Sequence, residues 1–339
     1  MRARAWMKGK GTCVLTVSLL LSLLSWSAQR ASANNTTFSG EATVVQATVL
    51  GLPPIVLSDT GALDSTGGAR EASLLDANVP GLLTAEVLHA STVGQGQRSS
   101  SEASVANVTL TVGGNTISAG LLRARATAEC HNGTASVSGS SEIVDLVVNG
   151  QAVVVSGQPN QTISLPVGRV IINEQQSSVS GNTGDITVNA LHVVVDGVAD
   201  VIISSAHADI TCGGPVCPGG DFVTGGGWIT GTPSGERGTF GVAGGIKNGG
   251  LWGHLTYIDH GTNMKVKGTG VTAYTVTGPT TRHIEGTADI NGRSGSYQVD
   301  VSDNGEPGRN DMFSITLSDG YHASGSLAGG NIQLHKPCK

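Results

Sequence analysis

Charged and aromatic side chains are scarce in this 339-residue chain: Asp, Glu, Lys and Arg together make up 13% and Phe, Trp and Tyr 4%. The formal charge is −6. Removal of the first 33 residues would take away five positive charges and no acid, and would lower the charge to −11, the five being Arg2, Arg4, Lys8, Lys10 and Arg30. Phosphate binding needs clustered Lys and Arg. The composition therefore argues against a nucleic-acid partner.

The local signatures of common enzymes are also missing. The chain has no G-x-S-x-G elbow, no H-E-x-x-H motif and no phosphate-binding glycine loop. These absences predict a protein that is not an enzyme and needs no cofactor. The alternative is a secreted hydrolase whose site is assembled from distant loops, where His89, His207 and nearby acids meet only in the fold.

Residues 1–33 have the pattern of a secretory signal peptide. Basic residues precede an apolar run over 14–26, and Ala31, Ser32 and Ala33 provide small residues for cleavage. The run is shorter than the roughly 20 residues of a spanning helix. No cysteine follows the small residues to carry a lipid, and we expect no transmembrane anchor. An extracellular protein, either released or held at the cell surface without a covalent link, is predicted.

Five cysteines become four once Cys13 is assigned to the signal peptide, leaving Cys130, Cys212, Cys217 and Cys338. An even number in an oxidising compartment predicts two disulfides, for which the sequence permits three pairings. Their positions favour Cys130 with Cys212, and Cys217 with Cys338. Zinc is the weaker reading, because no paired Cys or His knuckle accompanies them.

Glycine is abundant, with 50 residues that follow no fixed period between segments rich in Val, Ile and Leu. Alternating segments that end in glycine turns predict antiparallel strands over residues 34–212. Asn149-Gly150 and Asp196-Gly197 each separate two Val-rich segments and predict two-residue hairpin turns. One short helix is expected over residues 70–78, ending before Pro80.

A Gly, Pro and Cys-rich stretch at residues 213–220 interrupts the alternation and predicts a hinge between two domains. Residues 221–339 then predict a second β domain, a meander of eight or nine strands with one apolar and one polar face each. A closed barrel or a sandwich would bury those faces. The fold class is therefore all-β, with two antiparallel domains of sandwich or barrel type.

Several segments resemble the choice-of-anchor P family: residues 47–51 (ATVLG), 79–83 (VPGLL), 88–96 (LHASTVGQG), 153–163 and 187–209. Residues 221–229 (DFVTGGGWI) are similar to the start of the domain that often follows it. The resemblance covers nearly all of residues 34–339 and implies a bacterial cell-envelope or secreted protein. It implies no catalytic residues. The family's members carry C-terminal anchoring signals, and no such tail follows Cys338.

Two features are candidates for binding. The loop at 303–311 offers Asp303, Glu306 and Asp311, hard oxygen ligands of the kind that calcium prefers, with glycines beside them. A turn with solvated acids accounts for the same composition. Aromatic residues gather after residue 220, where they either stack on sugar rings or fill the core, namely Trp228, Trp252, Tyr257, Tyr274 and Tyr297.

These features together predict a secreted or cell-envelope-associated structural or binding protein, adhesin-like and without catalysis. The expected partner is an envelope glycan or protein. A glycan-binding module is the alternative within the same class, and the loop-assembled hydrolase is the alternative from another class.

Overall fold

The computed structural model describes residues 35–213, 220–247 and 249–336. Antiparallel strands make up most of these residues, and the one helical element among them is the short 3₁₀ turn η1 (Gly308–Asn310). The all-β prediction is confirmed. The predicted signal peptide, residues 214–219 of the predicted hinge and the predicted Cys217 to Cys338 bond lie outside the described residues.

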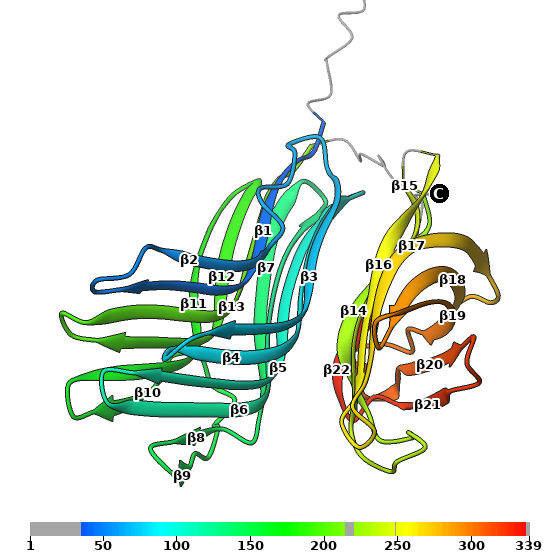
Figure 1. Ribbon diagram of the computed structural model, residues 1–339. Coiled ribbons are helices and arrows are strands. Elements are labelled where there is room, and N and C mark those ends of the chain that lie inside the picture. The colour runs from blue at the N-terminus through cyan, green and yellow to red at the C-terminus, as the bar shows by residue number, and fades with distance from the viewer. Residues whose placement is uncertain (1–34, 214–219, 248, 337–339) are drawn as a thin grey trace, which may run out of the picture. The chain divides into compact units, whose positions relative to one another are not determined.

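The first part of the chain forms two sheets that pack face to face; we call this pair the sandwich (Figure 1). One sheet has six strands in the order β10 (Gln161–Leu165), β11 (Gly168–Ser180), β12 (Thr183–Val195), β13 (Ala199–Thr211), β1 (Thr37–Val49) and β2 (Ile55–Asp59). The other has seven strands: β3 (Gly68–Val79), β4 (Leu83–Gln95), β5 (Arg98–Val112), β6 (Asn115–His131), β8 (Val147–Val148) and β9 (Gln151–Ala152) in this order, with β7 (Thr134–Val144) also pairing with β6.

Small and branched aliphatic side chains fill the space between the two sheets of the sandwich. On β6, Ala124, Ala126 and Ala128 are fully buried, and Val193 and Val201 are fully buried residues of the other sheet in the same core. Alternate residues of a strand point to the same face, so the long Ala and Val alternation builds one continuous apolar layer. Each side chain buries little area, and the strands of 13 to 17 residues supply the number that the core needs.

The strands of the six-stranded sheet bend partway along their length (Figure 1). The bend coincides with a row of residues left out of the regular pairing, among them Asn173 on β11 and Ser204 on β13, which have φ of 52° and 58°. Ser204 is fully buried, and its hydroxyl donates to the Leu122 carbonyl of the facing sheet at 3.1 Å. A hydroxyl that spans the two sheets satisfies buried polar groups at the irregular point.

Residues 70–78 do not form the predicted helix. They belong to β3, which pairs with β4 from Gly68 opposite Gly94 to Val79 opposite Leu83. The turn at Pro80 and Gly81 places β3 beside an already long strand, and pairing along the length of that strand outweighs the weak helical preference of a nine-residue segment.

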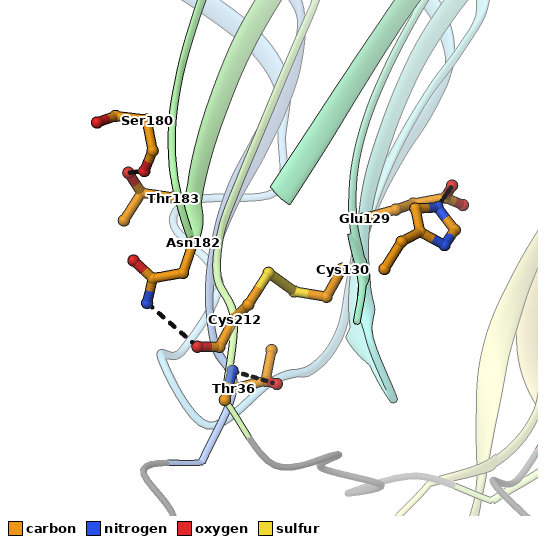
Figure 2. The surroundings of a disulfide bond; sticks show 9 residues. Thr36, Glu129, Cys130, Ser180, Asn182, Thr183 and Cys212 are labelled. Atoms are coloured by element: carbon orange, nitrogen blue, oxygen red, sulfur yellow. Dashed lines mark hydrogen bonds and ion pairs between the residues drawn. A yellow bond between two sulfur atoms is a disulfide. The ribbon is translucent and has the colours of Figure 1, made fainter. Parts of the chain in front are cut away.

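The predicted disulfide between Cys130 and Cys212 is present, with a Cα to Cα distance of 5.6 Å. Figure 2 shows that it links the end of β6 to the residue that follows β13, and so joins the two sheets of the sandwich. Asn182 donates its side-chain amide to the Cys212 carbonyl at 3.2 Å, and Gly213 donates its backbone N–H to the Thr36 hydroxyl at 3.2 Å. The bond closes a separation of 82 residues in the sequence.

The two predicted hairpin turns differ. Asn149 and Gly150 have φ of 51° and 76°, as a two-residue turn with positive φ at both positions requires. At the other turn, the left-handed conformation is found at Gly197, with φ of 69°, and Asp196 does not adopt it. Val198 extends this turn to three residues, because β12 ends at Val195 and β13 begins at Ala199.

Residues 222–335 form a single antiparallel sheet of nine strands, in agreement with the predicted meander; we call it the nine-stranded sheet. Its order is β21 (His322–Ser326), β20 (Met312–Leu317), β19 (Arg293–Ser302), β18 (Thr281–Ile290), β17 (Met264–Val276), β16 (Gly250–Asp259), β15 (Gly238–Lys247), β14 (Phe222–Ile229) and β22 (Gly329–His335).

The nine-stranded sheet curls around an aromatic core (Figure 1). The rings of Phe240 and Phe313 stack with centroids 3.9 Å apart, and Tyr257 and Tyr297 are also buried. The two tryptophans lie at its margin, Trp228 beneath the Arg237 guanidinium at 4.1 Å and Trp252 edge-on to Phe222. Core packing therefore accounts for the buried aromatic residues. No helix among the described residues is long and apolar enough to cross a membrane.

Candidate binding pocket

Charged and hydroxyl side chains gather on the outer face of the seven-stranded sheet, on β5, β6 and β7. The register places Arg125 of β6 opposite both Glu102 of β5 and Ser140 of β7, and Thr127 opposite Ser138. Arg98 lies opposite Glu129, and Arg123 opposite Glu142. Residues two apart on a strand share a face, so three adjacent strands build one polar array.

Arg123 lies between two carboxylates. Its Nη1 is 3.2 Å from Glu102 Oε2 and its Nη2 is 3.0 Å from Glu142 Oε2, and the side chain is 9% exposed. Burial opposes its charge, but the Glu102 and Glu142 carboxylates raise the pKa of Arg123 above its ordinary value. Burial raises the pKa of Glu102, and this outweighs the opposing effect of Arg123 and Arg125. Both Nη atoms of Arg123 are thus engaged in ion pairs, whereas its buried Nε has no hydrogen-bond partner among the described residues.

Arg98 and Arg125 are held less completely. With its amide oxygen turned toward them, Gln333 accepts from Arg125 Nη2 at 2.8 Å and from Arg98 Nη2 at 3.1 Å. Arg125 also pairs with Glu306, and Arg98 Nε lies 3.4 Å from Glu129 Oε1 without an aligned hydrogen bond. Burial and then the neighbouring charge of Arg125 lower the pKa of Arg98. Two guanidinium groups therefore share one neutral oxygen.

A pocket of about 420 Å³, which we call the arginine pocket, opens over this array. It is lined by Arg98, Arg123, Arg125, Thr127, Ser138, Gly139, Ser140, Glu306 and Pro307. Three cationic side chains and one anionic side chain give the lining a positive balance, although the whole chain is acidic. Apart from Glu306, its polar side chains are hydrogen-bond donors and hydroxyls on the paired strands β5, β6 and β7, which makes the arrangement suited to binding a polar anion.

The predicted calcium ligands Asp303 and Asp311 lie at a strand edge. Asp303 Oδ2 accepts from the backbone N–H of Leu334 at 2.9 Å, and Asp311 Oδ2 accepts from that of Ile332 at 2.8 Å. Glu142 Oε2 accepts from the N–H of Gly330 at 3.1 Å. These are alternate amides of β22, an end strand of the nine-stranded sheet, so the carboxylates take the place of a further strand.

Asp311 is fully buried, and burial raises its pKa to about 6. Hydrogen bonds from the backbone N–H groups of Ile332 and Asn304 favour the charged form and oppose this rise. Glu306 points to Arg125 and accepts from Asn331 at 3.3 Å. Among the described residues, no three His, Cys, Asp or Glu side chains form a group that could hold a metal ion. Calcium binding by Asp303, Glu306 and Asp311 stays a prediction, which the melting temperature in EDTA against millimolar calcium would test.

The hydrolase alternative depends on a histidine beside a serine and an acid, and His89 has such neighbours. Its Nδ1 lies 2.9 Å from Ser73 Oγ, which donates to Glu71 Oε2 at 3.0 Å. Because the serine proton is directed to Glu71, the network assigns the Nδ1 proton to His89, which donates to the serine. A catalytic histidine instead accepts the serine proton and donates to the acid.

The environment of His89 also opposes general-base chemistry. The side chain is 1% exposed, and burial lowers its pKa to about 3. His207 lies on β13 of the other sheet and pairs with Asp185 at 2.9 Å. The fold therefore does not bring His89 and His207 together in one site.

No family model, curated protein or solved structure matches the chain. The resemblance to the choice-of-anchor P family stays a prediction.

The arginine pocket was not predicted from the sequence. Its signal is the alternation Arg123, Ala124, Arg125, which places two cations on one face of a strand. Which acids and hydroxyls stand opposite depends on the register of β5 and β7, and spacing along the chain does not give that register.

Proposed function

We propose that this chain is a secreted or cell-envelope-associated binding protein of adhesin-like type that does not catalyse a reaction. The observation that supports this proposal is the arginine pocket, a set of donors and hydroxyls fixed on three paired strands. Groups held on a sheet lose little freedom on binding a ligand, which favours recognition. Binding requires no proton transfer, and the lining holds no histidine.

The choice-of-anchor P resemblance adds support for an envelope location, where the partner would be a glycan or a protein. Glycan binding is the more specific form of the proposal, because three residues of the lining, Thr127, Ser138 and Ser140, carry hydroxyl groups. The exported location itself is tested by expressing the full chain, recovering protein from the medium and envelope fractions, and sequencing its N-terminus. We expect the mature chain to begin near residue 34.

The test of function is retention of the mature protein on a panel of envelope glycans and extracellular proteins, with product analysis on the same panel. Retention without products supports a binding protein. Release of oligosaccharides or peptides would replace this proposal with the hydrolase. His89→Gln is the matched variant for that outcome, since it should leave retention unchanged and would abolish turnover only if the buried histidine acts in catalysis.

A further inference from the structure

After the ion pairs of the polar array are assigned, two cations remain for a ligand. Glu102 and Glu142 belong to Arg123, at 3.2 and 3.0 Å. Arg98 and Arg125 are left with Glu129 and Glu306, whose side chains are 36% and 48% exposed. Exposed carboxylates contribute little to an ion pair and move into water easily. A ligand anion could therefore replace them.

The Glu306 carboxylate occupies the pocket beside Arg125 and indicates which chemical group binds there. Burial alone would raise the pKa of Glu306, but its hydrogen bond to Arg125 and the charges of Arg125 and Arg123 hold that pKa below its ordinary value. The protein thus stabilises a carboxylate beside Arg125. A guanidinium group matches the two oxygens of a carboxylate or sulfate, and two such groups on one anion fix its orientation.

The opposite wall of the pocket carries hydroxyl groups. Thr127 and Ser138 face each other across β6 and β7, and Ser140 lies beside Arg125. The side chains of Ser138 and Ser140 are exposed and make no hydrogen bond to another described residue. A hydroxyl both donates and accepts, so this wall complements the hydroxyl groups of a sugar ring.

We propose that this pocket binds an acidic carbohydrate, with the carboxylate or sulfate of a sugar unit on Arg98 and Arg125 and its ring hydroxyls on Thr127, Ser138 and Ser140. This inference rests on the proposed binding function and names its ligand class. Acidic peptides fit less well, because Pro307 is the one apolar side chain in the lining and a peptide's apolar groups would stay in water. The ligand's anion takes the place of Glu306 at Arg125.

The experiment uses the full mature chain on three immobilised polymers: polygalacturonate, dextran sulfate and unmodified dextran. We expect retention on at least one acidic polymer and none on dextran, with weaker retention as salt is raised. The formal charge is −6 for the full chain and −11 without residues 1–33, so general attraction to polyanions does not account for retention. Competition by free galacturonate or galactose 6-sulfate then distinguishes the carboxylate from the sulfate.

Four variants locate the binding. Arg98→Gln should weaken affinity at least tenfold, and Ser138→Ala combined with Ser140→Ala about threefold to tenfold, because charged hydrogen bonds contribute more than neutral ones. Glu306→Gln should tighten binding severalfold by removing the internal competitor. Arg293→Gln, at an exposed position on β19, is the control and should have no effect. Melting temperatures establish that each variant is folded.

The outcomes separate this inference from the proposed function. If the natural protein binds an acidic polymer and neither Arg98→Gln nor Glu306→Gln changes that binding, the site lies elsewhere and the pocket assignment is overturned. Retention of neutral glycans or proteins, but of neither acidic polymer, would overturn the ligand class and leave a binding protein. Failure to retain any glycan or protein would overturn both.

Discussion

The sandwich and the nine-stranded sheet bury their β faces in different ways. Phe38 is the one aromatic residue between residues 35 and 212, and the sandwich core is otherwise aliphatic. The nine-stranded sheet has nine aromatic residues, and Phe240, Phe313, Tyr257 and Tyr297 are among the largest fully buried side chains of the described residues. One core is built from many small contributions, the other from a few large ones.

This difference explains the other features of each part. Alanine and valine bury little area per residue, so the sandwich uses long strands and a disulfide between its two sheets. An aromatic side chain buries 150–250 Å² and stacks with its neighbours, which lets shorter strands enclose a core. The loss of stability caused by core substitutions should therefore be spread over many positions in the sandwich. In the nine-stranded sheet it should be concentrated at a few aromatic residues.

Loss of the disulfide should have the largest effect. Cys130→Ala combined with Cys212→Ala frees a loop of 82 residues, and the chain-entropy relation gives a loss of about 4.5 kcal/mol. Amide hydrogen exchange measures the stability of the sandwich. Tryptophan fluorescence measures the unfolding of the nine-stranded sheet, because both described tryptophans lie there. Protection should fall in the sandwich while the tryptophan transition stays in place. An equal fall in both would mean that the two parts unfold as one unit.

Removal of a central ring should have nearly as large an effect, confined to the other part. Phe313 is fully buried and stacks on Phe240. Phe313→Ala should destabilise the nine-stranded sheet by about 4 kcal/mol, measured by urea unfolding with tryptophan fluorescence. The neighbouring Met312 is 45% exposed, and Met312→Ala should cost less than about 0.5 kcal/mol. Similar costs for the two variants would contradict a core built on a few rings.

A pH effect is expected in the nine-stranded sheet. The pKa of Asp311 is about 6 in the folded state, above its ordinary value of 3.8. The folded state then binds more protons than the unfolded state between these values, so stability is greatest below the unfolded pKa and falls as pH rises through 6. The fall should be on the order of 2 to 3 kcal/mol.

Urea unfolding between pH 4 and 7 measures this effect. Asp311→Asn should flatten the pH dependence, because the amide does not titrate. Asp319→Asn, at an exposed turn, should leave the slope of the natural protein unchanged. Identical slopes in the natural protein and Asp311→Asn would show that Asp311 ionises normally.

Much of the fold could be predicted from local signals in the sequence. Alternation gave the all-β class, and Asn149 with Gly150 gave a turn, because both depend on residues adjacent in the chain. The Cys130 to Cys212 bond followed from counting cysteines at segment ends. Residues 70–78 were wrongly predicted as a helix, because a distant pairing decided their structure.

The candidate site depends on contacts far apart in the chain. Asp303 and Asp311 were singled out for their acidity, but their bonds to Leu334 and Ile332 depend on where β22 lies in the sheet. Arg125 meets Glu306 across some 180 residues, and no spacing rule gives that contact. Composition can nominate such residues, and only the strand order gives their partners.

The smallest effect tests the turns, where the two parts should behave alike. Asn149-Gly150 in the sandwich and Asn291-Gly292 in the nine-stranded sheet both have positive φ, and an added Cβ at either glycine meets nothing within 4 Å. Gly150→Ala and Gly292→Ala should each cost about 1 kcal/mol, from backbone strain alone. Hydrogen exchange and tryptophan fluorescence measure the respective costs. Unequal costs would show that the aliphatic and aromatic cores support their turns differently, and the contrast would then extend beyond the core.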